Sequence, residues 1–248
     1  MISDKIAQSF SRAAKHYEQS TPIHHLIAQK LCTLLPKKVS SILELGCGTG
    51  LLTQELRNKY PESVITAIDI APKMIEQCNL SFEKNPRTHF VLCSAESYTY
   101  HEQVDLIVSS NAFHWFSDHG KIAQSALTSG RCFAVAIPVQ GLFQEFYDAY
   151  ESVTGESLSV VDLWHEEECE ERFRHLGLRM ENVLYEKRSL YMTNPWDVLR
   201  FIHGIGVAPS LKSPLLPRRL NKIVEQMPVT PYGIPVSYPI FYGVSKQV

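Results

Sequence analysis

The amino-acid sequence predicts an α/β protein built on a doubly wound, mostly parallel sheet. Two observations carry this prediction: short apolar runs alternate with segments of helical or turn character, and the first run leads into a turn with three glycines. Parallel strands that are buried on both faces are apolar throughout and are joined by helices, so this alternation indicates a parallel sheet. The expected strands are residues 41–45, 64–68, 89–93, 104–110 and 132–139.

The first 40 residues are expected to form a helical arm before the sheet. Thr21 and Pro22 suit the N-cap and the first position of a helix. Apolar residues then recur at helical spacing as far as Leu34, and Pro36 ends the helix. The arm therefore contributes helices and no strand.

The pattern loosens after Val139, where helices and two further strands are expected. Helices are predicted for residues 142–152, 166–177, 195–203 and 216–227, and strands for residues 180–192 and 238–245. The last strand is expected to run antiparallel to the others. Helices placed between the last two strands would cover the ligand-binding edge as a lid. The predicted division is an arm (1–40), a core (41–192), a helical lid (193–236) and a final core strand (237–248).

Composition excludes several classes of protein. Among 248 residues, 44% are hydrophobic and 20% are charged, which is typical of globular proteins. A net charge of -2 provides no general attraction to nucleic acid. The six cysteines form no C-x-x-C pair and have no histidine at zinc-ligand spacing, so we expect reduced thiols and no metal site. Neither a leader nor an apolar run of 18 residues is present, so we expect a cytoplasmic protein that does not enter a membrane.

The glycine turn and the acidic residue after it indicate the kind of ligand. Gly46, Gly48 and Gly50 follow the first strand, and Asp69 ends the second, 19 residues beyond Gly50. Such glycines let backbone approach a ligand, and such an acid accepts hydrogen bonds from a ribose diol. Glu44 precedes the first glycine and would repel a pyrophosphate. It suits a ligand with an ammonium group instead, and S-adenosylmethionine is one.

These motifs resemble those of the class I S-adenosylmethionine-dependent methyltransferases, with their Rossmann-like sheet and a first motif of an acid followed by G-x-G-x-G. The resemblance implies S-adenosylmethionine as the cofactor. Ser94 stands where many relatives have Asp, and it equally suits a helix N-cap. The residues expected to contact the cofactor are Glu44, Gly46, Cys47, Gly48, Asp69, Ile70, Met74, Ser94, Ala95, Glu96, Asn111, Ala112 and Trp115.

A narrower resemblance comes from the segment after the fourth strand and from four others. Residues 110–113, Ser-Asn-Ala-Phe, lack the Asn/Asp-Pro-Pro-aromatic stretch of DNA amine methyltransferases. With residues 10–17, 140–146, 199–206 and 238–243, the segment resembles the malonyl-acyl-carrier-protein O-methyltransferases of biotin synthesis. That resemblance implies methylation of a malonyl thioester, carried by acyl-carrier protein or coenzyme A. Relatives tend to have an Arg in the following helix, where this chain has only Lys121.

A malonyl carboxylate needs no base, because an acid with a pKa near ~4 is ionised at neutral pH. It needs a partner that selects it, and our candidates for the reacting end of the site are Tyr17, His114, Arg200 and His203. Arg200 equally suits a solvated helix face, and the other histidines suit surface or satisfied polar positions. Two alternatives stay open: a methyltransferase for another free acid or a quinone precursor, and a non-catalytic S-adenosylmethionine-binding module.

Overall fold

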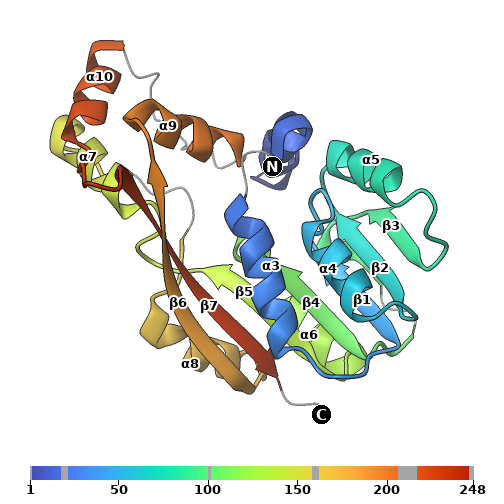
Figure 1. The fold of residues 1–248 in the computed structure, drawn as a ribbon. Helices are drawn as coiled ribbons and strands as arrows, with labels where there is room; N and C mark the ends of the chain where they lie inside the picture. Colours follow the sequence, from blue (N-terminus) through green and yellow to red (C-terminus); the bar gives the residue numbers. More distant parts are fainter. Residues whose placement is uncertain (1, 18–21, 100–101, 158–161, 206–216, 246–248) are drawn as a thin grey trace.

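The computed structural model describes residues 2–17, 22–99, 102–157, 162–205 and 217–245 (Figure 1). Within these ranges the strands are β1 (Ser41–Leu45), β2 (Val64–Asp69), β3 (Thr88–Leu92), β4 (Leu106–Ser110), β5 (Phe133–Pro138), β6 (Met180–Met192) and β7 (Ile234–Ser245). They form one sheet in the order β3-β2-β1-β4-β5-β7-β6. The first five strands pair in parallel, and β7 lies antiparallel between β5 and β6. The predicted fold class is therefore confirmed.

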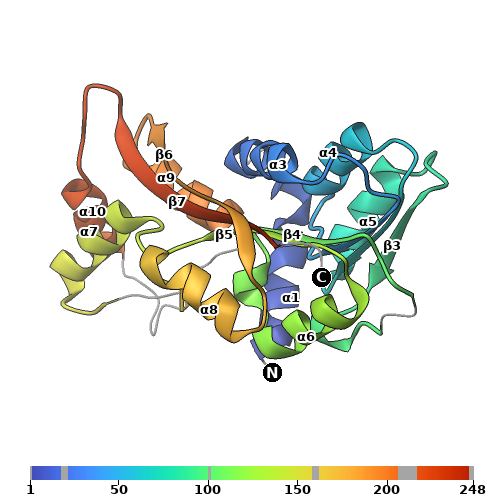
Figure 2. The same cartoon turned by 90° about the horizontal axis from the view of Figure 1, so that it is seen from below.

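Helices cover both faces of the sheet (Figure 2). The α-helices of the described ranges are α1 (Ile2–Ala13), α3 (Pro22–Leu34), α4 (Leu51–Lys59), α5 (Pro72–Ser81), α6 (His119–Ser129), α7 (Gln144–Thr154), α8 (Cys169–His175), α9 (Pro195–Gly204) and α10 (Pro217–Gln226). Short 3-10 helices are η1 (Ala14–His16), η2 (Ala95–Ser97), η3 (Phe113–Trp115) and η4 (Glu166–Glu168). No helix in these ranges is long and apolar enough to cross a membrane.

Two hydrophobic clusters, one on each face, hold the helices to the sheet. Ile42 of β1 belongs to the cluster that contains α3 and α4, and its neighbour Leu43 belongs to the one that contains α6 and α8. Successive strand residues point to opposite faces, so a fully apolar strand serves both clusters. This explains why the central strands could be recognised as continuous apolar runs.

The structure corrects several predicted boundaries, and two of these corrections have a clear cause in the backbone. β7 begins at Ile234, four residues before the predicted start, so the division at residue 237 falls inside the strand. Pro235 pairs only with β6, beyond the part of β7 that pairs with β5, and proline is tolerated where a backbone N–H needs no partner. Helix α7 begins at Gln144 and not at residue 142, because Gly141 and Phe143 have positive φ angles of 95° and 55°.

Most of the residues predicted to form the lid lie in the connection between β6 and β7. Helix α9 begins with a capping box of Asn194 and Asp197, and α10 packs against α7 (Figure 1). Ile205, at the end of α9, is buried. Residues 206–216 and Lys212 among them lie outside the described residues. Closure over the site by this region stays a prediction.

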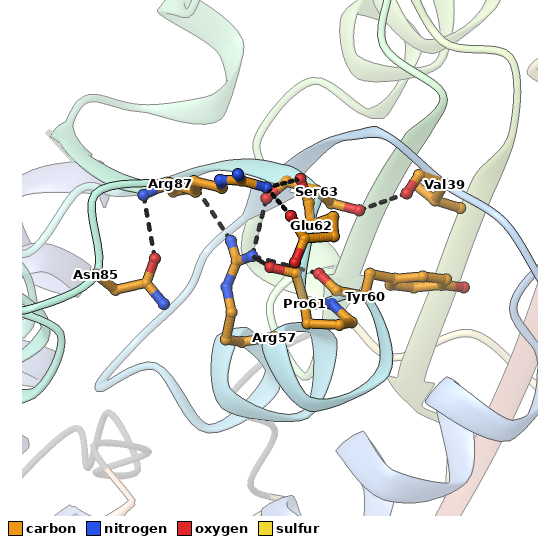
Figure 3. A network of polar contacts seen from close by, with 8 residues as sticks. All are labelled: Val39, Arg57, Tyr60, Pro61, Glu62, Ser63, Asn85 and Arg87. Carbon is orange, nitrogen blue, oxygen red and sulfur yellow. Dashed lines mark hydrogen bonds and ion pairs between the residues drawn. The ribbon is translucent and has the colours of Figure 1, made fainter.

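Arg57 of α4 binds the turn between α4 and β2 to the start of β3 (Figure 3). Its guanidinium donates to the carbonyl oxygens of Tyr60 (3.3 Å), Pro61 (2.9 Å), Ser63 (2.9 Å) and Arg87 (3.0 Å) and to the hydroxyl of Thr88 (3.1 Å). The network lies where β2 and β3 begin, at the edge of the sheet opposite the glycine turn. Its role is structural.

Replacing Arg57 by lysine should lower the free energy of unfolding by roughly 1 to 3 kcal/mol. A lysine keeps the charge but has no planar fork, so it leaves several of these carbonyl groups without a donor. Urea unfolding measures the change, and cofactor affinity should stay at the wild-type value because the network is remote from the glycine turn. Unchanged stability would contradict this role for the fork.

Candidate active site

The carboxyl ends of β1, β2 and β4 surround a cavity of about 430 Å³. All the residues expected to contact the cofactor line this cavity, namely Glu44, Gly46, Cys47, Gly48, Asp69, Ile70, Met74, Ser94, Ala95, Glu96, Asn111, Ala112 and Trp115. Ile6 and Phe10 of α1 and Tyr17 line it as well. The first part of the predicted arm is thus part of the wall, and from here on 'the arm' means residues 2–17. We refer to this space as the first cavity.

The three glycines of the turn all have positive φ angles, but they serve different purposes. A Cβ on Gly46 would lie 2.3 Å from the Cβ of Ala112, and a Cβ on Gly50 would lie 2.8 Å from the Phe82 ring. These two glycines let neighbouring segments pack closely. Among the residues that the structure describes, a Cβ on Gly48 would meet only the Tyr17 ring, at 3.9 Å, so Gly48 is the glycine of the turn that keeps backbone open toward the cavity.

Asp69 is held in place by the glycine turn. Its Oδ2 accepts a hydrogen bond from the Gly48 amide and its Oδ1 accepts one from the Ala71 amide, each at 2.8 Å. Burial raises the pKa of Asp69, and these two hydrogen bonds act against that shift. Each oxygen keeps capacity for another donor, so the carboxylate can receive both hydroxyls of a ribose.

Glu44 is a buried carboxylic acid at the base of the first cavity. Its side chain is 1% exposed, and Oε2 accepts a hydrogen bond of 2.6 Å from the Thr53 hydroxyl. Burial raises the pKa of Glu44 to about 8, and the Thr53 hydrogen bond only partly offsets this. Among the described residues, no Lys or Arg lines the cavity to neutralise it. A ligand that brings an ammonium group would supply that charge, so Glu44 and Asp69 together fit S-adenosylmethionine.

Replacing Glu44 by glutamine should remove the pH dependence of stability that this residue contributes. The folded protein binds a proton at Glu44 up to about pH 8, whereas the unfolded chain loses it near pH 4.5. Stability of the ligand-free protein therefore falls with rising pH in that window, by up to about 1.4 kcal/mol per unit from this group. Glu44→Gln should remove this slope, raise the unfolding midpoint at pH 7 and weaken cofactor binding. Parallel slopes in thermal unfolding of the two proteins would contradict the assignment.

A second cavity of about 140 Å³ adjoins the first. The two share Phe10, Tyr17, His24, Asn111 and Trp115, and the second continues between the segment after β5 and helix α7. His114 lines this second cavity, as does Ile205 at the end of α9. Of our candidates for the reacting end, Tyr17 and His114 are thus brought together.

Arg200 and His203 lie elsewhere. Both are exposed on α9 and line a separate surface groove with Trp196, and Arg200 forms an ion pair with Asp197. They line neither cavity in the described ranges. Contact between these residues and an acceptor stays a prediction.

Sequence reasoning missed His24 and Tyr238 as members of the site. Both are buried and line the second cavity. The available signal for His24 was its place beside the apolar stripe of α3, since Ala28 and Leu31 lie four and seven residues further on and are buried. A histidine on such a face needs a polar partner, but sequence spacing does not reveal which one.

Comparison with known proteins agrees with this geometry. A family model described as a methyltransferase domain matches residues 42–128. A putative methyltransferase from Bacillus halodurans C-125 superimposes with a TM-score of 0.62 at 11% identity, covering 89% of this chain and 99% of that one. Residues 42–128 therefore match a methyltransferase domain, and the sheet that contains them has the fold of a solved methyltransferase structure.

Two curated relatives of this chain are both named malonyl-[acyl-carrier protein] O-methyltransferase. The protein of Acetivibrio thermocellus is 36% identical over 162 residues, but the match spans only 56% of its length and 61% of this chain. The protein of Geobacter sulfurreducens is 25% identical over 264 aligned positions, which cover 98% of both chains. The likeness thus extends beyond the cofactor-binding half, at lower identity.

Proposed function

We propose that the protein transfers the methyl group of S-adenosylmethionine to the free carboxylate of a malonyl thioester. The observation that carries this proposal is the lack of basicity in the second cavity. Burial lowers the pKa of His24 to about 4 and that of His114 to about 3. Both imidazoles are therefore weak bases toward a phenol or an amine at neutral pH, whereas a carboxylate has no proton to lose. The names of the two relatives support the same acceptor.

The second cavity offers neutral hydrogen-bonding groups to the acceptor. The Nδ1 atom of His114 is buried and has no hydrogen-bond partner within the described part of the chain. A buried polar atom without a partner costs about 1 to 3 kcal/mol, so a ligand that pairs with it gains affinity. Among the described residues no Lys or Arg lines this cavity, and its acidic residue, Glu151, is exposed. We infer that neutral donors such as His114 and Gln140 hold the carboxylate.

The remaining requirement is geometry. When bound, S-adenosylmethionine supplies an electrophilic methyl group on a sulfonium. Residues shared by the two cavities would hold a carboxylate oxygen beside it and keep water out. Proximity and orientation of this kind supply on the order of 7 to 11 kcal/mol. Exclusion of water strengthens the attraction between the opposite charges.

The decisive experiment offers several acceptors to the purified protein. Malonyl-carrier protein, malonyl-coenzyme A, free malonate and a phenol are each incubated with S-adenosylmethionine, and the products are weighed. We expect a methyl ester of the malonyl thioester, with a turnover number that is nearly constant from about pH 6 to 8 at saturating cofactor. Methylation of only a free small molecule would favour a methyltransferase for another free acid or a quinone precursor. Cofactor binding without any product would favour a non-catalytic S-adenosylmethionine-binding module.

We further propose that the acidic carrier protein docks on helix α10. Arg218, Arg219 and Lys222 are exposed on that helix, which packs against α7 at the wall of the second cavity. Complementary charges raise association rates and are screened by salt, with a Debye length of roughly 8 Å at physiological ionic strength. The partner would therefore be steered to the lid side of the molecule.

Reversing Arg218 and Arg219 to glutamate should raise KM for malonyl-carrier protein and leave KM for malonyl-coenzyme A unchanged. The effect should shrink as salt is added. Arg174 and Arg179 are also exposed and flank the end of α8, so their reversal is a matched control. An equal response of both acceptors, or of both variants, would show that α10 does not receive the carrier.

A further inference from the structure

A chain of hydrogen bonds joins four side chains from distant parts of the sequence. The Tyr17 hydroxyl lies 3.1 Å from Nδ1 of His24, and Nε2 of His24 lies 2.9 Å from the Tyr238 hydroxyl. The Tyr238 hydroxyl then lies 3.1 Å from Oδ1 of Asn111. The members come from the arm, α3, β7 and the end of β4. The first three are buried, at 9%, 7% and 3% exposure.

The direction of the protons along this chain can be deduced. A tyrosine hydroxyl has one hydrogen, and Tyr238 donates its hydrogen to Asn111. The Tyr238 oxygen must then accept the hydrogen of His24 Nε2. In a neutral imidazole the other nitrogen is an acceptor, so Tyr17 donates to Nδ1. The pKa of His24, which burial lowers to about 4, agrees with a neutral ring.

The chain lies where the two cavities meet. Tyr17, His24 and Asn111 line both cavities, and Tyr238 lines the second. The arm reaches this point with aromatic contacts, since the Phe10 ring lies 6.4 Å from the Tyr17 ring and 5.6 Å from the Trp115 ring. Within the described residues, His24 is the member that bonds both to the arm and to the sheet.

We propose that His24 is a positioning residue that fastens the N-terminal arm over the junction of the two cavities and orients Tyr238 and Asn111 there. It acts through its neighbours and takes no proton from the acceptor. The junction is the place where acceptor meets cofactor under the proposed function, and to that extent the inference rests on it. Breaking both hydrogen bonds of His24 should free the arm without unfolding the sheet.

The test compares two replacements of His24 in the full chain. Leucine keeps much of the volume but neither accepts nor donates, whereas glutamine can do both. Arg12 and Lys15 are exposed on the arm, so trypsin cleavage there reports release of the arm. We expect His24→Leu to speed this cleavage about tenfold or more and to lower kcat about a hundredfold, with a smaller change in cofactor affinity. His24→Gln should restore most of both.

The controls separate this inference from folding and from the proposed function. His25→Leu changes a neighbouring histidine that bonds to Gln29 instead, and it should behave as wild type. Should His24→Leu fail to fold, Tyr17→Phe removes the hydroxyl that bonds to His24 and keeps the ring, and it should also free the arm. The cleavage assay needs cofactor alone, so it decides the question even if no malonyl thioester is methylated. Wild-type cleavage and kcat in His24→Leu, or equal losses in the leucine and glutamine variants, would overturn the proposal.

Discussion

Replacing Asp69 by alanine is expected to weaken S-adenosylmethionine binding by about ten- to a hundredfold, which corresponds to roughly 1.5 to 3 kcal/mol for hydrogen bonds to a charged group. Both carboxylate oxygens are already oriented by the amides of Gly48 and Ala71, so they present fixed acceptors to the ribose diol. Alanine removes the acceptors and also leaves those two amides without their partner. Titration calorimetry with the folded variant measures the loss.

A matched control for this substitution lies at the other end of the sheet. Asp105 also accepts two backbone hydrogen bonds, from the amides of Ser40 at 2.8 Å and Ser41 at 3.3 Å, but it lies where β1 begins. Asp105→Ala should lower stability and leave cofactor affinity unchanged. If Asp69→Ala behaves in the same way, with wild-type affinity in a folded protein, Asp69 does not bind the ribose.

Local features explain why much of the fold could be predicted. β1 and β6 match the predicted ranges without change, because their residues are apolar runs or extended segments bounded by turn residues. Asp69 was recognisable because it ends a strand at a fixed distance from the glycine turn. Each of these features is set within one strand and its adjoining turn, where the sequence pattern is informative.

The parts that could not be predicted depend on partners far away in the sequence. His24 and Tyr238 are 214 positions apart, and neither residue type signals the other. Gly46 was expected to let a ligand approach, yet the group that occupies the space beside it is Ala112. Arg200 is a second example. Whether its side chain faces solvent or the site depends on how α9 packs, and the sequence motif that contains it does not determine this packing. Whether a given side chain reaches the site therefore depends on tertiary contacts that the sequence pattern does not reveal.

The arm gives the last prediction, because it lines the site without supporting the core. Ile6, Phe10 and Tyr17 line the first cavity, and α1 packs against α5. The two large hydrophobic clusters of the sheet contain no described residue from the first 20. Removing residues 1–20 should therefore leave a folded sheet, with a circular dichroism spectrum and cooperative unfolding close to those of the full chain.

The same deletion should reduce turnover by about a hundredfold or more, since it opens the cavity to water and removes Tyr17 from the junction with the acceptor. Cofactor binding should weaken less, because Glu44, Asp69 and the glycine turn all remain. Single-turnover measurements at saturating cofactor separate the two effects. Phe10→Ala is the milder companion variant: it keeps the chain length and loosens the aromatic contact with Trp115, so its turnover should fall between the truncated and full-length proteins. Full turnover in the truncated protein would mean that residues 1–20 do not shield the reaction from water.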